Sequence, residues 1–265
     1  MYDTFSADYD RFVNWPARLA AELPFIEQQL QMLAQPEQDR LRLLDAACGT
    51  GMHAIALAAR GHAAAGADGS SGMVERARAN AKAAGASIRF EQAGFGDLTP
   101  TFGRESFDAL LCLGNSLPHA ISPVALSATL ADFAACLRPG GLLLVQNRNF
   151  DAVLAGRQRW MEPQTYTEGD RQWLFVRFYD FQPDGLIQFN ILTLQRQPGG
   201  EWQQQITTTT LRPLLERELS QALEQAGFDD LIPYGNMSPA VPFDPQSSGN
   251  LVVVARKTNR QAAQG

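Results

Sequence analysis

The sequence has few cysteines and no long apolar run. Cys48, Cys112 and Cys136 are widely spaced and form no C-x-x-C pair, so we expect neither a disulfide framework nor a zinc site. Buried, reduced thiols are the expectation, and they fit a cytoplasmic location. No stretch of about 18 apolar residues is present. The first residues also lack a basic segment followed by an apolar one, so the sequence predicts neither a membrane span nor a signal peptide.

Positive charge is also scarce. The chain has 22 Lys and Arg against 28 Asp and Glu, a net charge of −6, and its basic residues do not gather in one run. Binding to nucleic acid depends on Lys and Arg that neutralise phosphates, so we expect no nucleic-acid partner. With 265 residues, 45% of them hydrophobic, the chain is long enough for one large α/β domain or for a domain plus a sizeable insertion.

Short apolar runs alternate with helical patterns through the first half of the chain. A helix over residues 15–34 comes first, and after a polar break at 36–40 the predicted strands are 41–47, 63–67, 87–92, 107–113 and 142–146. The predicted helices between them are 52–60, 71–84 and 125–137. This alternation predicts an α/β fold with a doubly wound, mostly parallel sheet.

The pattern changes after residue 151. Three predicted strands, 172–180, 186–195 and 202–211, are joined by the turn sequences Gln182-Pro183-Asp184-Gly185 and Pro198-Gly199-Gly200. They predict an antiparallel insertion. A helix over 213–226 and strands over 228–234 and 251–255 then complete the sheet, and a polar tail follows from 258.

The first strand runs into a turn rich in small residues, Asp45-Ala46-Ala47-Cys48-Gly49-Thr50-Gly51. Small residues at 47, 49 and 51 let the backbone turn sharply and approach a ligand closely. Asp68 ends the second strand, where a carboxylate can accept both hydroxyls of a ribose. We expect Asp68 to have no structural partner in the protein, and we expect the space beside Gly51 to be taken by the ligand.

A dinucleotide cofactor is one interpretation of this turn, because Gly49-x-Gly51-x-x-Ala54 approximates the dinucleotide-binding fingerprint. An oxidoreductase is therefore an alternative function. However, Asp45 at the mouth of the strand would repel a pyrophosphate and suits an ammonium group. The chain also lacks a second mononucleotide-binding half.

Four separated motifs agree with a different cofactor. They are Asp-x-Ala-x-Gly-x-Gly at 45–51, Asp68 followed by Ser70 and Met73, Phe-Asp-Ala-Leu-Leu at 107–111, and Leu-Arg-Pro-Gly-Gly at 137–141. In this order they resemble the class I S-adenosylmethionine (SAM)-dependent methyltransferases. The resemblance implies a seven-stranded Rossmann-like sheet with the antiparallel β insertion. It also implies that Asp45, Ala47, Gly49 and Gly51 surround the methionine part of SAM and that Asp68 holds the ribose.

The adenine end departs from the family pattern. Many members carry an acid after the third strand, where this chain has Glu91-Gln92-Ala93-Gly94-Phe95, and Asp97 lies too far along for that role. We expect adenine to be held by the backbone near Gly94 and by packing against Phe95. Leu113, at the end of the fourth strand, completes the predicted cofactor site.

The ends of the fourth and fifth strands carry the acceptor candidates. They read Leu113-Gly114-Asn115-Ser116-Leu117-Pro118-His119 and Gln146-Asn147-Arg148-Asn149-Phe150-Asp151, and both resemble the glycine/sarcosine N-methyltransferase branch. The resemblance implies that Gly114 and Asn115 line the acceptor pocket, that Arg148 grips a carboxylate, and that His119 stands at the rim. Two alternatives stay open: Arg148 pairs with Asp151 or another acid and anchors the loop, and His119 packs against the insertion.

The sequence therefore predicts an enzyme that methylates a small-molecule acceptor, with the amine of a small amino acid as a candidate. O-methylation or another N-methylation of a different metabolite and a non-catalytic SAM-binding module are the alternatives, and a homo-oligomer stays open. Aromatic residues for a lid or pocket are Tyr2, Tyr9 and Trp15 near the start, and Trp160, Tyr166 and Tyr179 in the insertion. The predicted divisions are a helical lid (1–40), a SAM-binding core (41–150), the insertion as acceptor and lid region (151–211), a C-terminal helix and hairpin (212–257) and a tail (258–265).

Overall fold

Strands and helices alternate along the chain, and the computed structural model describes residues 2–33 and 40–259. The helices are α1 Tyr2–Phe12, α2 Trp15–Gln31, α3 Met52–Ala58, α4 Ser71–Ala83, α5 Leu98–Phe102, α6 Pro123–Cys136, α7 Phe150–Ala155 and α8 Glu216–Gln225, with a 3₁₀ turn η1 at Leu117–His119. The strands are β1 Arg42–Asp45, β2 Ala63–Asp68, β3 Arg89–Gln92, β4 Phe107–Cys112, β5 Leu137–Arg148, β6 Gln164–Glu168, β7 Arg171–Phe181, β8 Ile187–Arg196, β9 Trp202–Leu211, β10 Phe228–Tyr234 and β11 Asn250–Lys257. Most of the predicted tail (260–265), most of the polar break (36–39) and Ala34 lie outside the described residues.

Seven strands form the main sheet, in the order β10-β11-β5-β4-β1-β2-β3. All neighbours from β5 to β3 pair in parallel, and β11 is antiparallel to both β5 and β10. The predicted doubly wound, mostly parallel fold is therefore confirmed. Register places Asp45 beside Leu111, and Cys112 beside Val145, so the carboxyl ends of β1, β4 and β5 meet at one edge. Ligand sites of such sheets lie at that edge.

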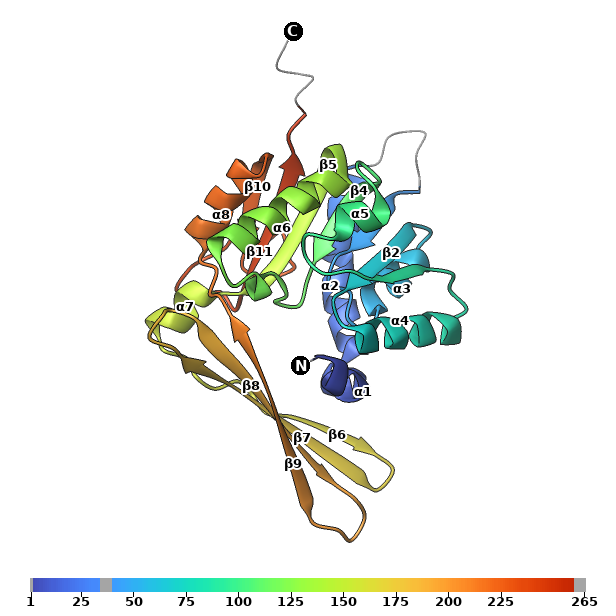
Figure 1. Cartoon of the computed structure of the whole chain (residues 1–265), viewed down its shortest axis with the longest axis vertical. Helices are drawn as coiled ribbons and strands as arrows, with labels where there is room; N and C mark the ends of the chain where they lie inside the picture. The colour runs from blue at the N-terminus through green and yellow to red at the C-terminus, as the bar shows by residue number, and fades with distance from the viewer. Residues whose placement is uncertain (1, 34–39, 260–265) are drawn as a thin grey trace.

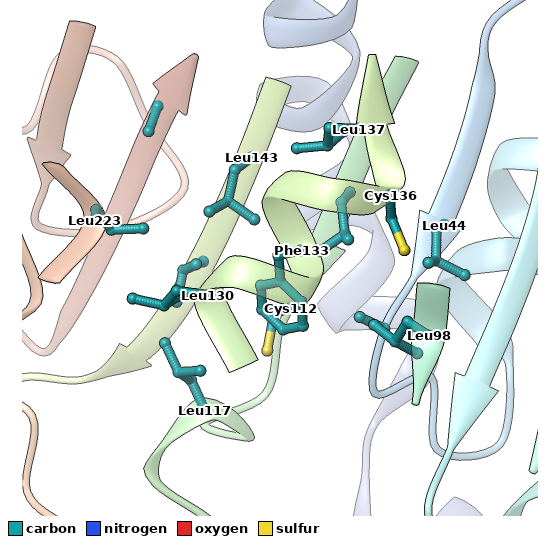
Figure 2. Packing of buried hydrophobic residues seen from close by; sticks show 14 of the residues in the cluster. Leu44, Leu98, Cys112, Leu117, Leu130, Phe133, Cys136, Leu137, Leu143 and Leu223 are labelled. Carbon is teal, nitrogen blue, oxygen red and sulfur yellow. The ribbon is translucent and has the colours of Figure 1, made fainter. Parts of the chain in front are cut away.

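Alternation of side chains along the strands divides the core into two faces. On one face, α6 and α8 cover Leu44, Cys112 and Leu143, and Figure 2 shows Leu130 and Phe133 of α6 packed there. On the other face, α2 and α3 cover Leu43 and the neighbouring strands. Because the parallel strands are buried on both sides, they consist of continuous apolar runs rather than alternating ones. The cysteines Cys48, Cys112 and Cys136 are all buried and unpaired.

The insertion is a four-stranded antiparallel sheet, β6-β7-β8-β9, that extends away from the main sheet (Figure 1). The sequence predicted β7, β8 and β9 but missed β6, because its side chains are largely exposed and lack an apolar face. The insertion also begins with a short helix, α7, which starts at the capping side chain of Asn149. The predicted antiparallel character is confirmed apart from this first turn.

Helix α1 lies within the predicted helical lid (1–40), although no separate helix was predicted over residues 2–12, and its side chains contact both parts of the molecule. Asp10 bonds to Thr50 (Oγ1 to Oδ1, 2.6 Å) and to Arg76 (Nε to Oδ2, 2.8 Å) in the main domain. Arg11 bonds to Glu168 of β6 (3.1 Å). These contacts place α1 between the main domain and the insertion (Figure 1). The sequence of α1 is short and weakly apolar, so it does not by itself predict a helix. Tertiary contacts of this kind stabilise the helix instead.

The predicted lid residues at the start have different surroundings. Tyr9 lines the cavity described below, whereas Trp15 is buried against His53. The side chain of Tyr2 lies outside the described part. None of the helices within 2–33 and 40–259 is long and apolar enough to cross a lipid bilayer.

Candidate active site

A cavity of about 670 Å³ opens at the carboxyl edge of the main sheet, bounded also by α1, α2 and the insertion. Eight of the eleven predicted site residues line it: Ala47, Gly49, Asp68, Gly94, Phe95, Asn115, His119 and Arg148. The other three, Asp45, Gly51 and Leu113, are buried behind the lining. The fold therefore brings both predicted strand-end groups, for cofactor and for acceptor, into one space.

The glycine turn uses its two glycines for different purposes. Gly49 has φ +52°, and its N–H donates to Oδ2 of Asp68 (2.9 Å). Gly51 has φ +81°, and a Cβ there would lie 2.7 Å from Cζ of Phe90 and 2.9 Å from Cβ of Ala77. The expectation that ligand fills the space beside Gly51 is wrong, because the side chains of β3 and α4 already occupy it.

Asp68 is held in place by the backbone. Its Oδ2 accepts the Gly49 bond, and its Oδ1 accepts the N–H of Ser70 at 2.9 Å. The expectation that Asp68 has no structural partner is therefore wrong. A carboxylate has about four acceptor positions, so it retains capacity for a ribose hydroxyl while these bonds fix its orientation.

Asp45 is a buried carboxyl that lacks a full set of partners. It is 3% exposed, and its Oδ1 has no hydrogen-bond partner among the described residues. Burial, with a smaller contribution from the charge of Asp68, raises the pKa of Asp45 to about 6. A buried carboxylate of this kind is stabilised by a cation, so the residues present fit the ammonium group of a methionine moiety.

At the predicted adenine end, Phe95 stands beside the cavity with its ring edge-to-face against Phe133 (5.6 Å between centroids). Met73 lines the same region. Asp97 is exposed and does not line the cavity. The described lining at this end thus offers backbone and apolar side chains, with no acid in the position that many relatives of the predicted family use.

Helix α2 contributes a buried charged network that sequence reasoning missed. Glu22 accepts from Nε of Arg18 (3.1 Å) and bonds Nε2 of His53 (2.7 Å). A Cβ added to Gly114 would lie 3.4 Å from Nη2 of Arg18, so this guanidinium faces the end of β4. In the sequence, the i,i+4 spacing of Arg18 and Glu22 is typical of a solvent-exposed pair, and nothing indicated that it lines a cavity.

The acceptor candidates on β4 and β5 are linked directly. Oδ1 of Asn115 accepts the backbone N–H of Arg148 at 3.0 Å, and Asn115 has φ +67°. Gln146 fixes the same turn by accepting the N–H of Gly114 at 2.8 Å. The two strand ends therefore form one rigid wall of the cavity.

Arg148 does not pair with Asp151. Oδ2 of Asp151 instead accepts the N–H of Glu216 at the start of α8 (3.0 Å). Nε of Arg148 is buried without a hydrogen-bond partner, and no carboxylate lies within 4 Å of its guanidinium in the described part of the chain. The loop-anchor alternative, in which Arg148 pairs with Asp151 or another acid, is therefore wrong for the described part of the chain.

His119 lies in η1, between the main sheet and the insertion. Pro118 beside it accepts the backbone N–H of Arg212 (2.8 Å), so this turn does pack against the end of the insertion. His119 also lines the cavity, and burial lowers its pKa to about 4. The imidazole is therefore neutral near pH 7 and places no positive charge beside an acceptor.

The insertion closes the far side of the cavity with Met161, Arg177, Tyr179, Phe189 and Thr209, among others. Of its predicted aromatic residues, Tyr179 lines the cavity and burial raises its pKa to about 12. Trp160 is 60% exposed and Tyr166 is 36% exposed, and neither lines the cavity. Phe150 is fully buried, with its ring centroid 6.2 Å from that of Tyr179.

Comparison with known proteins agrees with this geometry. A family model described as a methyltransferase domain matches residues 43–141. A glycine/sarcosine N-methyltransferase of Aphanothece halophytica is 31% identical over 88% of this chain and 81% of its own length. One from Halorhodospira halochloris is 35% identical over 57% of this chain, a match that spans about half (54%) of that relative. A SAM-dependent methyltransferase structure from Clostridium acetobutylicum has a TM-score of 0.75 at 16% identity, covering 97% of this chain and 99% of its own.

The chain belongs to the class I SAM-dependent methyltransferases, and its cofactor is SAM. Within that class it lies near the glycine/sarcosine N-methyltransferase branch. The dinucleotide-dependent oxidoreductase is thereby excluded as the family of this chain.

Proposed function

We propose that this enzyme transfers the methyl group of SAM to the amine of a small acceptor that carries a carboxylate. The observation that supports this most is Arg148, whose buried Nε has no partner in the described residues although its side chain lines the cavity. The planar fork of a guanidinium matches a carboxylate, to which it can donate two parallel hydrogen bonds. The glycine/sarcosine N-methyltransferases similar to this chain are named for acceptors of that kind.

The cofactor would lie along the ends of β1 and β2. Asp45 would stabilise its ammonium group, Ala47 and Gly49 would contact its methionine part, and Asp68 would accept its ribose hydroxyls. Arg18 would bind its carboxylate, because that guanidinium lines the cavity and faces Gly114 at the end of β4, which is the neighbour of β1. Gly94 and Phe95 would enclose the adenine. When bound, SAM supplies an electrophilic methyl group on a positively charged sulfur.

The residues of the chain then have to align the acceptor and exclude water. Orientation of this kind can supply about 7–11 kcal/mol of the barrier. An amine attacks with a free lone pair, so it must be neutral when it meets the methyl group. Neutral His119 and Asn115 can accept or donate hydrogen bonds there without adding charge. Arg148 would hold the carboxylate, and this contact sets the position of the amine.

Two segments would enclose the reaction. We assign α1 and α2 the part of a lid, since Tyr9 of α1 and Arg18 of α2 line the cavity and Asp10 ties α1 to Thr50. The insertion would select the acceptor, because Met161, Arg177 and Tyr179 come from it. Closure by two such elements keeps water from the methyl group.

Formation of S-adenosylhomocysteine from SAM tests this proposal. The purified chain is incubated with matched acceptors: amino acids, the corresponding amines without a carboxylate, and hydroxy acids in which the amine is replaced by a hydroxyl. We expect turnover with the amino acids and at least tenfold less with each counterpart. Turnover confined to hydroxy acids would mean O-methylation. Binding of SAM without turnover of any acceptor, in a panel that includes N-methylated amino acids, would favour a non-catalytic module.

A further inference from the structure

A second arginine faces the cavity from the insertion. On β7, side chains alternate between the two faces of the sheet, so Trp173, Phe175, Arg177 and Tyr179 share one face. Trp173, Phe175 and Tyr179 are at most 2% exposed. Arg177 is thus a charged residue within an otherwise apolar row, and it lines the same cavity as Arg148.

Neither arginine is neutralised within the described part of the chain. Nε of Arg177 is buried without a hydrogen-bond partner, as is Nε of Arg148. Arg177 has a long bond from Nη2 to the carbonyl of Glu162 (3.5 Å), and its guanidinium lies 5.0 Å from the ring centroid of Phe12. No carboxylate within 4 Å of either guanidinium is found among residues 2–33 and 40–259.

The acids that line the cavity are engaged elsewhere. In the described lining they are Glu22 and Asp68. Glu22 binds Arg18 and His53, and Asp68 binds the backbone of the glycine turn and of Ser70. Both acids thus belong to the cofactor side. The acceptor side carries two guanidinium groups and no counter-charge from the described lining.

Two like charges in a partly enclosed cavity are unfavourable without an anion. Burial lowers the pKa of Arg177, and the nearby charge of Arg148 lowers it further. Both guanidinium groups nevertheless stay protonated, since arginine is not deprotonated in proteins under ordinary conditions. One carboxylate that is bound bidentately by Arg148 leaves the donors of Arg177 unsatisfied. A second anionic group would satisfy them and would remove the repulsion.

We propose that the acceptor carries two acidic groups, the first bound by Arg148 and the second, a carboxylate or a phosphate, bound by Arg177. The acceptor class is then a small amino acid with an acidic side group, and the inference rests on the function proposed above. In the transfer, the amine lone pair forms the new N–C bond, the electrons of the broken C–S bond stay on sulfur, and an amine proton leaves to water. We assign the carboxylate of the cofactor to Arg18 of α2, which lines the cavity with its partner Glu22, and not to Arg177, which comes from the insertion on the far side.

Matched pairs of acceptors test this inference on the wild-type enzyme with SAM. The pairs are aspartate with asparagine, glutamate with glutamine, and O-phosphoserine with serine, and the measured quantity is the ratio of kcat/KM within each pair. Loss of one charge-assisted contact corresponds to a decrease of about tenfold or more in kcat/KM. We expect the acidic member of at least one pair to be favoured at least tenfold. The pair that shows the preference tells whether the second group is a carboxylate or a phosphate.

Variants then test whether Arg177 is the source of the preference. Arg177→Met should lower the ratio at least tenfold, and Arg177→Lys should give an intermediate ratio. Arg171→Met is the matched control, because Arg171 is an exposed arginine on the same strand and its removal should leave the ratio unchanged. Thermal melting shows whether each variant is folded, and the wild-type ratios do not depend on any variant.

A probe without an amine separates this inference from the proposed function. With S-adenosylhomocysteine bound, succinate should stabilise the wild-type protein against thermal unfolding more than butyrate does, and Arg177→Met should abolish the difference. Methylation of glycine without any preference for acidic acceptors would overturn the inference and leave the proposed function standing. A succinate effect without methylation of any amine would overturn the proposed function instead. An acidic preference that persists in Arg177→Met would also refute the role of Arg177.

Discussion

The side-chain oxygen of Asn115 accepts the backbone N–H of Arg148 at 3.0 Å, so the ends of β4 and β5 are tied together across the active-site edge. Asn115 adopts φ +67°, a left-handed conformation that Asn tolerates better than most residues. The bond fixes the backbone from which the Arg148 side chain extends. Asn115 is therefore suited to position the arginine as well as to line the cavity.

Replacement of Arg148 should impair acceptor binding and spare cofactor binding. Arg148→Ala removes charge-assisted hydrogen bonds that are worth about 1.5–3 kcal/mol, so the KM for the acceptor should rise by one to two orders of magnitude. Arg148→Lys should recover part of this, because a point charge cannot reproduce the planar fork. SAM affinity, measured by calorimetry, should barely change. Unchanged KM and turnover in Arg148→Ala would remove the arginine from the acceptor site.

Asp45→Asn should stabilise the protein without SAM at high pH. The folded-state pKa, about 6, is above the ordinary value of 3.8, so protonation favours the folded state. The contribution of protonated Asp45 to the free energy of unfolding is complete below about pH 4 and is lost as the pH rises through 6. Above pH 6 the free energy of unfolding is lower by about 3 kcal/mol. Denaturant unfolding should therefore show a gain for Asp45→Asn at pH 8 that disappears near pH 4.

The same variant should bind SAM more weakly, because it removes the negative charge that we assign to the cofactor ammonium. Asp229→Asn is the control for a change of net charge, since Asp229 is exposed on β10. A gain in stability that is equal at pH 4 and pH 8 would contradict the electrostatic origin. Unchanged SAM affinity would contradict the placement of the ammonium.

Asp68→Asn should reduce SAM affinity at least tenfold, because the amide loses one acceptor oxygen and with it part of the ribose contact. It should also cost some stability, since the carboxylate accepts from both Gly49 and Ser70. Calorimetric titration with SAM gives the first effect, and thermal melting gives the second. Asp97→Asn, an exposed acid near the same sheet edge, should change neither. A stability loss with native SAM affinity would make Asp68 a purely structural residue.

Gly51→Ala should destabilise the protein more than Gly85→Ala does. Both glycines have positive φ, +81° and +66°, which costs an L-residue about 1–2 kcal/mol. At Gly51 the new Cβ would also overlap Phe90 and Ala77, whereas at Gly85 it meets nothing within 4 Å. Overpacking adds about 1–3 kcal/mol, so the free energy of unfolding should fall further in Gly51→Ala. Equal losses in the two variants would show that the overlap relaxes at no cost.

Asp10→Asn should speed the release of SAM. Asp10 holds α1 to the glycine turn through Thr50 and to α4 through Arg76, so weaker contacts should let this segment open more often. Stopped-flow measurement of SAM dissociation gives the rate, with Asp8→Asn as control because the bond of Asp8 to Arg11 stays within α1. Equal dissociation rates in the two variants and the wild type would argue against α1 as a lid.

Local sequence patterns were sufficient for the main sheet. Mostly apolar runs such as residues 43–47 and 107–113, each with a single acid, identify strands that are buried on both faces. The small residues at 47, 49 and 51 mark the turn after β1. The elements missed were α1, α5, α7, η1 and β6, and all of these except α1 have six residues or fewer. Their conformation depends on contacts with distant segments, such as Asp10 with Arg76, that carry no local periodicity.

The sequence by itself determined the doubly wound sheet and its carboxyl edge, because side-chain periodicity and strand–helix order are local properties. The methyltransferase class and the turn expected to hold the cofactor followed from the resemblance of its motifs to that family. Only the tertiary structure decided which groups meet across the cavity. In the tertiary structure, Asp151 bonds to the start of α8 and not to Arg148, and Phe90 lies against Gly51. The tertiary structure also placed Arg177, which follows Arg148 by 29 positions in the sequence, in the same cavity as Arg148. Contacts between separate elements depend on how sheets and helices pack, and spacing along one strand or turn does not encode them.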